Sequence, residues 1–498
     1  MEMVTLDGKN LTIHKLFNIA YKYEKVEVKK NQWSKIRAAS TFVNKCSTQK
    51  KAIYGINTGL GALSQARIAE RDVIKIQHNI LLSHNAGVGE PCAPELVRAA
   101  LALRINTLVS GYCGVSEQLV KNLVTLLNKN IIPVVPRQGS VGASGDLAPL
   151  AAIGSVVLGK GEVIYQGKRI PARTALRRAG LKPLTLKPKE GLSLINGTQF
   201  STGIASVINA VGTTLCDVAD TCGAMSLDAL KGSVVPFSRR LMRLRPHPGA
   251  QQSAQNIRNV IRGSHILKSH RDCPKVQDPY SLRCMAHVHG AVRDIFRFAR
   301  NMIEIEMNSV TDNPIVFPHE KAILSGGNFH AEPIAFALDT MALGLAELAS
   351  IAERRVFRLL DSKLSGLSAF LTTQPGLHSG FMMAQVTAAA LVSQNKILCH
   401  PASVDSIPTS ANQEDHVSMS MNAGLKALEV LENTKYVLAI ELLCACQALD
   451  LLKPLKTSPP LEKIKKSIRR VVPFITTDRP LTPEIERVKA IIESDFLT

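Results

Sequence analysis

Three consecutive residues, Ala143, Ser144 and Gly145, have the types that a peptide backbone needs in order to react with itself. Glycine has no Cβ, so its amide nitrogen can approach the carbonyl carbon two residues earlier. Ring closure with loss of water gives an imidazolone, and loss of the serine hydroxyl as a second water leaves an exocyclic methylidene. That product is an electrophile, which no ordinary side chain provides. The tripeptide is therefore a candidate for a built-in electrophilic group.

Simpler interpretations of the same tripeptide must be weighed. A flexible loop of small residues is common, and a short motif carries a high risk of a false match. A phosphate-binding loop is excluded because no Lys-Ser or Lys-Thr pair follows the glycines. A dinucleotide-binding fingerprint is excluded because Pro133 and Pro136 stand where a regular strand should precede the glycines. The choice between a flexible loop and a cyclised one depends on the rest of the chain.

The elements that must position this loop are of two kinds. Residues up to about 200 form short helical segments broken by glycine and proline, with a β-hairpin predicted over residues 161–172. Farther on, apolar residues recur at helical spacing over residues 289–307, 333–360, 382–398 and 423–452, with a short hairpin at 314–324. The pattern predicts a mainly α fold, a long-helix bundle with a smaller mixed N-terminal region that carries the Ser144 loop. We expect domains at residues 1–202, 203–455 and 456–498, the last a separately packed helical tail.

Composition indicates a globular enzyme. The chain of 498 residues is 45% hydrophobic, which is ample for a large core. The first ten residues lack the apolar centre of a signal peptide, and the most apolar stretch, residues 436–452, is interrupted by Glu441 and Asp450. We therefore expect a cytoplasmic protein with no membrane partner. No metal site is expected, because His287 and His289 have no evident third ligand.

The formal charge of +20 is the strongest argument for a different function, since a basic surface can bind nucleic acid. The positive residues are dispersed apart from residues 239–245 and 463–470, and a single tryptophan with 4% aromatic residues leaves little for base stacking. The same charge would raise the local concentration of a carboxylate substrate. We therefore expect no specific nucleic-acid partner.

One reaction that needs a built-in electrophile is the elimination of ammonia from an α-amino acid. The enzyme must supply an electrophile for the amine, a base for the β-proton, a clamp for the carboxylate and a pocket for the side chain. Arg283 is a candidate clamp, because the planar guanidinium can bind both carboxylate oxygens. Tyr280 lies three residues earlier, on the same face if a helix begins near Pro279.

The chain resembles the histidine and aromatic amino acid ammonia-lyases over nearly its whole length. Eight segments carry the resemblance, in the order typical of that family: residues 54–61, 83–91, 139–151, 191–198, 277–284, 308–314, 325–330 and 401–419. The resemblance implies the fumarase/aspartase-like architecture and a homotetramer with shared active sites. It also implies that residues 143–145 form methylidene imidazolone (MIO), with no external cofactor.

The resemblance further implies roles for individual residues. Tyr54, on a glycine-rich lid loop, is the base, and Asn196 contacts the cofactor and the substrate. Arg283 binds the substrate carboxylate, with Tyr280 close to the reacting atoms. Phe329 packs beside the MIO ring.

Two positions predict the substrate. His84 is typical of the histidine and tyrosine enzymes, whereas glutamate at position 414 is typical of the histidine enzymes and is replaced by glutamine in the others. A carboxylate forms a charge-assisted hydrogen bond with an imidazole and offers little to a phenyl ring. We expect the conversion of L-histidine to trans-urocanate and ammonia, with Glu414 also taking part in catalysis. A tyrosine ammonia-lyase or aminomutase is one alternative, and a catalytically inactive basic binding protein is another.

Overall fold

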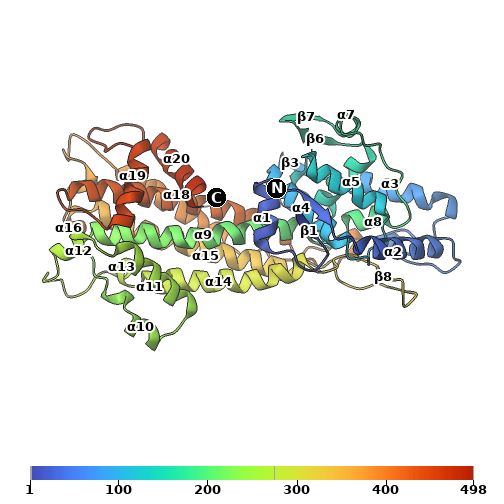
Figure 1. Cartoon of the computed structure of the whole chain (residues 1–498), viewed down its shortest axis with the longest axis horizontal. Coiled ribbons are helices and arrows are strands. Elements are labelled where there is room, and N and C mark those ends of the chain that lie inside the picture. Colours follow the sequence, from blue (N-terminus) through green and yellow to red (C-terminus); the bar gives the residue numbers. More distant parts are fainter. Residues whose placement is uncertain (1–2, 274, 497–498) are drawn as a thin grey trace. The chain divides into compact units, whose positions relative to one another are not determined.

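Two compact units make up the chain, which is described here by a computed structural model of residues 3–273 and 275–496 (Figure 1). The first unit contains residues 1–210, 299–339 and 401–425, and the second contains residues 211–298, 340–400 and 426–498. This division differs from the three contiguous domains that the sequence predicts. The helix α9 (Gln199–Ala229) contributes residues to both units, and residues 456–498 belong to the second unit. No cut at a single position therefore separates them.

The first unit is built from short helices and four small sheets, as the broken pattern of the N-terminal region predicts. Helices α3, α6 and α8 pack on one another, and α4 packs on α1 and α5. The sheets pair β1 with β2 in parallel, and pair β3 with β5, β4 with β6 and β7, and β8 with β9 in antiparallel fashion. The elements are β1 (Val4–Leu6), α1 (Ile13–Tyr21), β2 (Val26–Val28), α2 (Gln32–Ser47), η1 (Gly61–Leu63), η2 (Glu70–Asp72), α3 (Val73–His84), β3 (Val88–Pro91), α4 (Pro94–Leu108), α5 (Glu117–Asn128), β4 (Ile132–Pro133), β5 (Pro136–Gln138), α6 (Leu147–Ser155), η3 (Val156–Leu158), β6 (Glu162–Tyr165), β7 (Lys168–Pro171), α7 (Ala172–Arg178), α8 (Glu190–Ile195), the start of α9, β8 (Ile315–Phe317), β9 (Ala322–Leu324) and η6 (Ser410–Asn412).

Both hairpins predicted from the sequence are confirmed. In the β6–β7 hairpin Tyr165 pairs with Lys168, so Gln166 and Gly167 form a two-residue loop. Both loop residues have positive φ, 52° and 73°, which is the backbone that matches the twist of the flanking strands. The β8–β9 hairpin pairs Val316 with Ile323.

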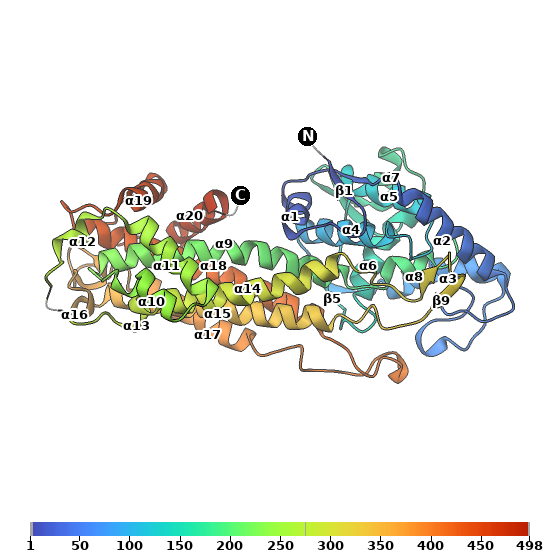
Figure 2. The ribbon, with the colours of Figure 1, turned by 60° about the horizontal axis from the view of Figure 1, so that its bottom comes forward.

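The second unit is a helical bundle. Parts of α9, α14 (Met285–Met307), α15 (Glu332–Leu360) and α18 (Ser420–Leu451) lie side by side in it (Figures 1 and 2). The long helices predicted by apolar periodicity are thus confirmed. The other elements are η4 (Val235–Phe237), α10 (Arg239–Leu244), α11 (Pro248–Ile261), α12 (His265–Ser269), α13 (Tyr280–Arg283), α16 (Ser362–Ser365), η5 (Ala369–Leu371), α17 (Met382–Leu398), α19 (Pro459–Val471), α20 (Thr482–Ile491) and the π-helical turn η7 (Ile492–Phe496).

A buried polar network connects the four long helices of the second unit. Arg355 on α15 donates to both carboxylate oxygens of Glu441 on α18, and neither side chain is exposed. On α14, Nδ1 of His289 lies 2.8 Å from Asp220 of α9. Arg293 donates to the same aspartate. Nε2 of His289 lies 3.4 Å from Nη1 of Arg355, so both ring nitrogens of His289 contact charged side chains of the bundle.

Two of the described helices have the length and composition of a membrane span. Among the described residues, α9 and α15 contain 18-residue windows of mean hydropathy 1.3 and 1.6. These windows are 78% and 67% buried inside the protein, which is the behaviour of core helices.

Candidate active site

The tripeptide of residues 143–145 lies in the loop between β5 and α6, where the backbone is drawn tightly together. Gly145 has a φ of +75°, and a Cβ at this position would lie 2.2 Å from the carbonyl oxygen of Gly197. Gly145 forms backbone bridges with Ala143 and with Gly197. Only glycine fits this approach of two chain segments. The structure therefore requires glycine at position 145, where the Ala143, Gly145 and Gly197 backbones come together.

The segment after Glu414 supports this loop from one side. Ala143 is buried in a small apolar cluster with Val417 and Met419. The Met419 amide donates to the Val141 carbonyl at 2.9 Å, and the Ser418 hydroxyl donates to the Gly142 carbonyl at 3.1 Å. These contacts fix the distance between the tripeptide and the Glu414 segment, although the two are 270 residues apart in sequence.

Glu414 binds Ser144 directly. The Ser144 hydroxyl donates to Oε1 of Glu414 at 2.8 Å, and the Thr409 hydroxyl donates to Oε2 at 2.6 Å. Thr409 and Glu414 also pair through their backbones, which closes a tight loop over η6. Both carboxylate oxygens are therefore oriented, one towards the candidate electrophile and one towards a fixed hydroxyl.

Tyr54 lies in the same region, on the loop that leads to η1. Its hydroxyl accepts a hydrogen bond from the Gly61 amide at 3.2 Å, and a Cβ on Gly61 would lie 2.8 Å from the Ser410 hydroxyl oxygen. The Tyr54 loop thus meets the loop that ends at Glu414. Burial raises the pKa of Tyr54, the Gly61 amide lowers it, and the charge of Glu414 raises it further, so that the net shift is upward.

His84 is the last residue of α3, and its Nδ1 lies 3.0 Å from the Ser83 hydroxyl. Burial lowers the pKa of His84, and the Ile80 carbonyl and the charge of Glu414 offset this only in part. The imidazole is therefore shifted towards its neutral form. The charge of Glu414 therefore raises the pKa of both Tyr54 and His84.

Asn196, at the end of α8, is buried beside the Gly197 bridge. Its Nδ2 donates to the Asn313 carbonyl at 2.9 Å, whereas its Oδ1 is buried with no hydrogen-bond partner among the described residues. Arg104, which is fully buried, fixes this segment by donating to the Asn196 carbonyl and to Gln199. Asn196 therefore offers one free acceptor on a rigid support.

Asp146, which follows the tripeptide, connects it to the start of α9. Its amide donates to the Gly197 carbonyl at 2.7 Å, and its carboxylate accepts from the Ser201 amide at 2.7 Å. Burial raises the pKa of Asp146 to about 6, against hydrogen bonds from Ser201 and Phe200 that lower it, and the charge of Glu306 adds to the increase. The Asp146 carboxyl is therefore a buried, hydrogen-bonded support of the loop.

The remaining predicted site residues lie in two places. Phe329, half-buried, belongs to the first unit between β9 and α15, and its packing against the tripeptide stays a prediction. Tyr280 and Arg283 belong to the second unit on the short helix α13, whose N-cap is Pro279, as predicted. The Arg283 guanidinium stacks on the Tyr280 ring at 4.5 Å, and its Nε is buried without a partner among the described residues. Their place beside Ser144 also stays a prediction.

Sequence reasoning missed three residues that organise the site, namely Arg104, Asp146 and Thr409. Asp146 could have been found from its position next to Gly145. Arg104 gives no local signal, because a buried arginine in a helix looks like a surface one until its carbonyl partners are known. Thr409 lies inside the segment that contains Glu414, and the spacing of five residues suggests a contact only when the loop geometry is seen.

The chain matches a family model described as aromatic amino acid lyase over residues 11–470. A histidine ammonia-lyase of Koribacter versatilis is 47% identical over 512 residues, covering 100% of this chain and 99% of the relative. The crystal structure of histidine ammonia-lyase from Trypanosoma cruzi superposes with a TM-score of 0.92 at 40% identity, covering 100% of this chain and 94% of that one. The tyrosine aminomutase of Streptomyces globisporus superposes with a TM-score of 0.95 at 35% identity, covering 100% and 98%.

Proposed function

This chain belongs to the aromatic amino acid lyase family, and we propose that it is a histidine ammonia-lyase that converts L-histidine to trans-urocanate and ammonia. The observation that carries the proposal is the hydrogen bond between Ser144 and Glu414. It puts a carboxylate at the atoms that form the electrophile, where a substrate imidazole could bind it.

The cofactor of the proposed enzyme is MIO, formed from Ala143, Ser144 and Gly145. The Gly145 nitrogen bonds to the Ala143 carbonyl carbon with loss of one water, and the Ser144 hydroxyl leaves as a second water. When formed, the group supplies an electrophilic methylidene carbon for the substrate amine. The left-handed φ of Gly145 and its contact with Gly197 support this closure.

Tyr54 is the proposed base for the β-proton of the substrate. It is half-buried, and the Gly61 amide orients its oxygen. The phenolate is the form that accepts a proton, and burial disfavours that form. The reaction therefore depends on the fraction of Tyr54 that is ionised, which increases with pH.

Glu414 and His84 form the proposed imidazole pocket. Glu414 accepts the imidazole N–H, with Thr409 keeping its other oxygen in place. His84, shifted towards the neutral form, can donate or accept at the other side of the substrate ring. Asn196 offers its free Oδ1, and Phe329 covers the cofactor. Arg283 binds the carboxylate end, and Tyr280 takes part in catalysis close to the reacting atoms.

A tyrosine ammonia-lyase or aminomutase is the second candidate, because the fold is equally close to that of a solved tyrosine aminomutase. Glu414 argues against it, since a phenol that contacts His84 leaves the carboxylate without a donor. The inactive binding protein is not retained, because the full-length relatives are named as enzymes. The cytoplasmic location and the homotetramer with shared active sites are part of the proposal.

The test compares L-histidine with L-tyrosine as substrates and follows product absorbance. A carboxylate left without a donor once bound substrate excludes water costs about 2–4 kcal/mol, so kcat/KM should favour histidine roughly thirty- to a thousandfold. Glu414→Gln should lower the ratio of kcat/KM for histidine to kcat/KM for tyrosine, whereas Glu320→Gln, at an exposed position, should leave this ratio unchanged. Equal kcat/KM for the two substrates would overturn the assignment to histidine.

Cofactor formation has its own readout. Mass spectrometry of the peptide that contains residues 143–145 should find it lighter by two waters, and Ser144→Ala should abolish the modification with the fold intact. An unmodified tripeptide in active enzyme would refute the MIO proposal.

A further inference from the structure

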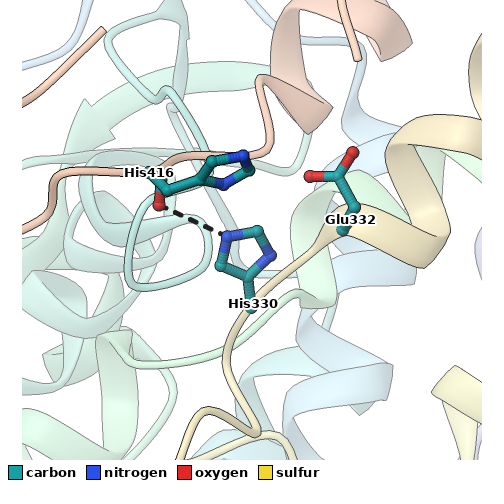
Figure 3. A group of neighbouring side chains, drawn as sticks. All are labelled: His330, Glu332 and His416. Carbon is teal, nitrogen blue, oxygen red and sulfur yellow. Dashed lines mark hydrogen bonds between the residues drawn. The ribbon is translucent and has the colours of Figure 1, made fainter. Parts of the chain in front are cut away.

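Two histidines and a glutamate come together in the first unit, beside the segments that carry Phe329 and Glu414 (Figure 3). His330 follows Phe329, Glu332 is the first residue of α15, and His416 lies two residues after Glu414. Each offers one ligand atom, and these atoms all lie within 4.8 Å of one another. None of the three has a role in the proposed elimination.

The rings of His330 and His416 lie close together. Their centroids are 5.7 Å apart and the ring planes meet at 32°. Nε2 of His330 lies 3.4 Å from the His416 carbonyl oxygen, as the dashed line in Figure 3 marks. A metal-binding histidine commonly donates its second N–H to a backbone carbonyl, which fixes the tautomer. In the tautomer whose Nε2–H donates to this carbonyl, Nδ1 of His330 keeps the lone pair that binds a metal.

One oxygen of the Glu332 carboxylate has no hydrogen-bond partner among the described residues. This oxygen, Oε2, is buried. A buried acceptor that is left unpaired is costly, and a cation bound here would remove that cost.

We propose that His330, Glu332 and His416 bind one Zn²⁺ ion. Two imidazoles and a carboxylate form a known ligand set for zinc with an open fourth position, whereas Mg²⁺ and Ca²⁺ prefer oxygen ligands. At Zn–ligand distances of about 2.1 Å, tetrahedral ligand atoms are about 3.4 Å apart. Small side-chain rotations therefore complete the site from the present separations.

The sequence gives no signal for this site, because 84 residues separate Glu332 from His416. Bound zinc would tie the segment that carries Phe329 to the segment that carries Glu414. The proposal does not depend on the ammonia-lyase activity, and metal binding alone tests it.

The experiment uses the full-length protein, freed of metal by chelation and titrated with ZnCl₂ in equilibrium dialysis. We expect one ion per chain at the site. His416→Ala and Glu332→Gln should each weaken zinc binding by roughly 100-fold, since even outer partners of metal ligands change affinity by that order. His319→Ala removes an exposed histidine of the same unit and should have no effect.

Co²⁺ as a spectroscopic probe separates this site from zinc bound to thiols. The absorption bands of a tetrahedral Co²⁺ ion with nitrogen and oxygen ligands are expected. They should be lost in Glu332→Gln, which is a nearly isosteric change. Circular dichroism can check that this variant is folded. Zinc affinity that is unchanged in both ligand variants would overturn the proposal. Thiolate charge-transfer bands that disappear in Cys273→Ser, the exposed cysteine, would also overturn it.

Discussion

The Ser144 hydroxyl donates a 2.8 Å hydrogen bond to Oε1 of Glu414, and this oxygen loses its donor when Ser144 loses its hydroxyl. In the proposed enzyme, cyclisation of the tripeptide would free one carboxylate oxygen of Glu414 for the substrate, while Thr409 keeps the other in place. The Glu414 side chain would then bind the loop before cyclisation and the substrate after it.

Thr409 is expected to position Glu414. Thr409→Val removes the 2.6 Å hydrogen bond to Oε2 and keeps the side-chain volume. A hydrogen bond to a charged group contributes about 1.5–3 kcal/mol, so kcat/KM for histidine should fall roughly 10- to 100-fold. Steady-state kinetics measures this change.

Thr409→Ser is the matched rescue variant, because it restores the hydroxyl. Activity similar to that of the wild type in Thr409→Val would show that the backbone pairing of residues 409 and 414 is sufficient to orient the carboxylate.

The pH profile of the enzyme should report Tyr54. The phenolate fraction of Tyr54 increases with pH, and because burial raises the pKa of this phenol, the increase continues to higher pH than for a free tyrosine. We expect kcat/KM to increase with pH and to level off only above about pH 10, where Tyr54 is ionised. Tyr54→Phe should lower kcat by roughly 10²- to 10⁴-fold. An unchanged rising limb in the residual activity of that variant would assign the titration to another group.

Arg283 should not tolerate lysine. The guanidinium stacks on Tyr280 and presents an unpartnered Nε, and lysine keeps the charge but loses the planar two-point geometry. Arg283→Lys should reduce kcat/KM roughly 10- to 100-fold. Arg297→Lys, at an exposed position on α14, is the control. Near-normal kinetics in Arg283→Lys would make Arg283 a structural residue.

Asp146 should make the protein less stable as pH rises from about 4 to about 6. Its folded-state pKa is raised to about 6, so in this window the native state keeps a proton that the unfolded chain has lost. A difference of about two pKa units corresponds to about 3 kcal/mol of unfolding free energy, with no further change above that window.

Denaturant unfolding of the wild type and of Asp146→Asn across this window measures the effect. In Asp146→Asn the free energy of unfolding should not decrease between about pH 4 and about pH 6. In Asp272→Asn, which changes an exposed carboxylate, it should decrease as in the wild type. A decrease of equal size in Asp146→Asn would place the proton elsewhere.

The sequence predicts elements whose signal is local. The loop Gln166-Gly167 and the apolar periodicity of α14, α15, α17 and α18 were sufficient for the hairpin and the long helices. The helix α9 was not singled out, because polar residues such as Asp220 interrupt its apolar pattern and find partners only in the folded bundle. The two units could not be found, because each is assembled from three distant segments.

The site follows the same rule. Ser144 and Glu414 are recognisable because their residue types are tied to chemistry, and the structure brings them together. Arg104 and Thr409 act through geometry alone, and a residue type does not reveal which carbonyl or carboxylate it will meet.

The pairing of Arg355 with Glu441 limits which alignments of α15 and α18 can form. Apolar neighbours such as Leu438 and Leu442 would accept a shift of one helical turn, about 5.4 Å, because the replacement contacts are also apolar. The charged pair would not, since such a slip separates two fully buried charges, and breaking a buried pair costs about 3–5 kcal/mol. A bundle with α15 and α18 misaligned is therefore less stable than the native one, so Arg355 and Glu441 favour the native alignment of these helices.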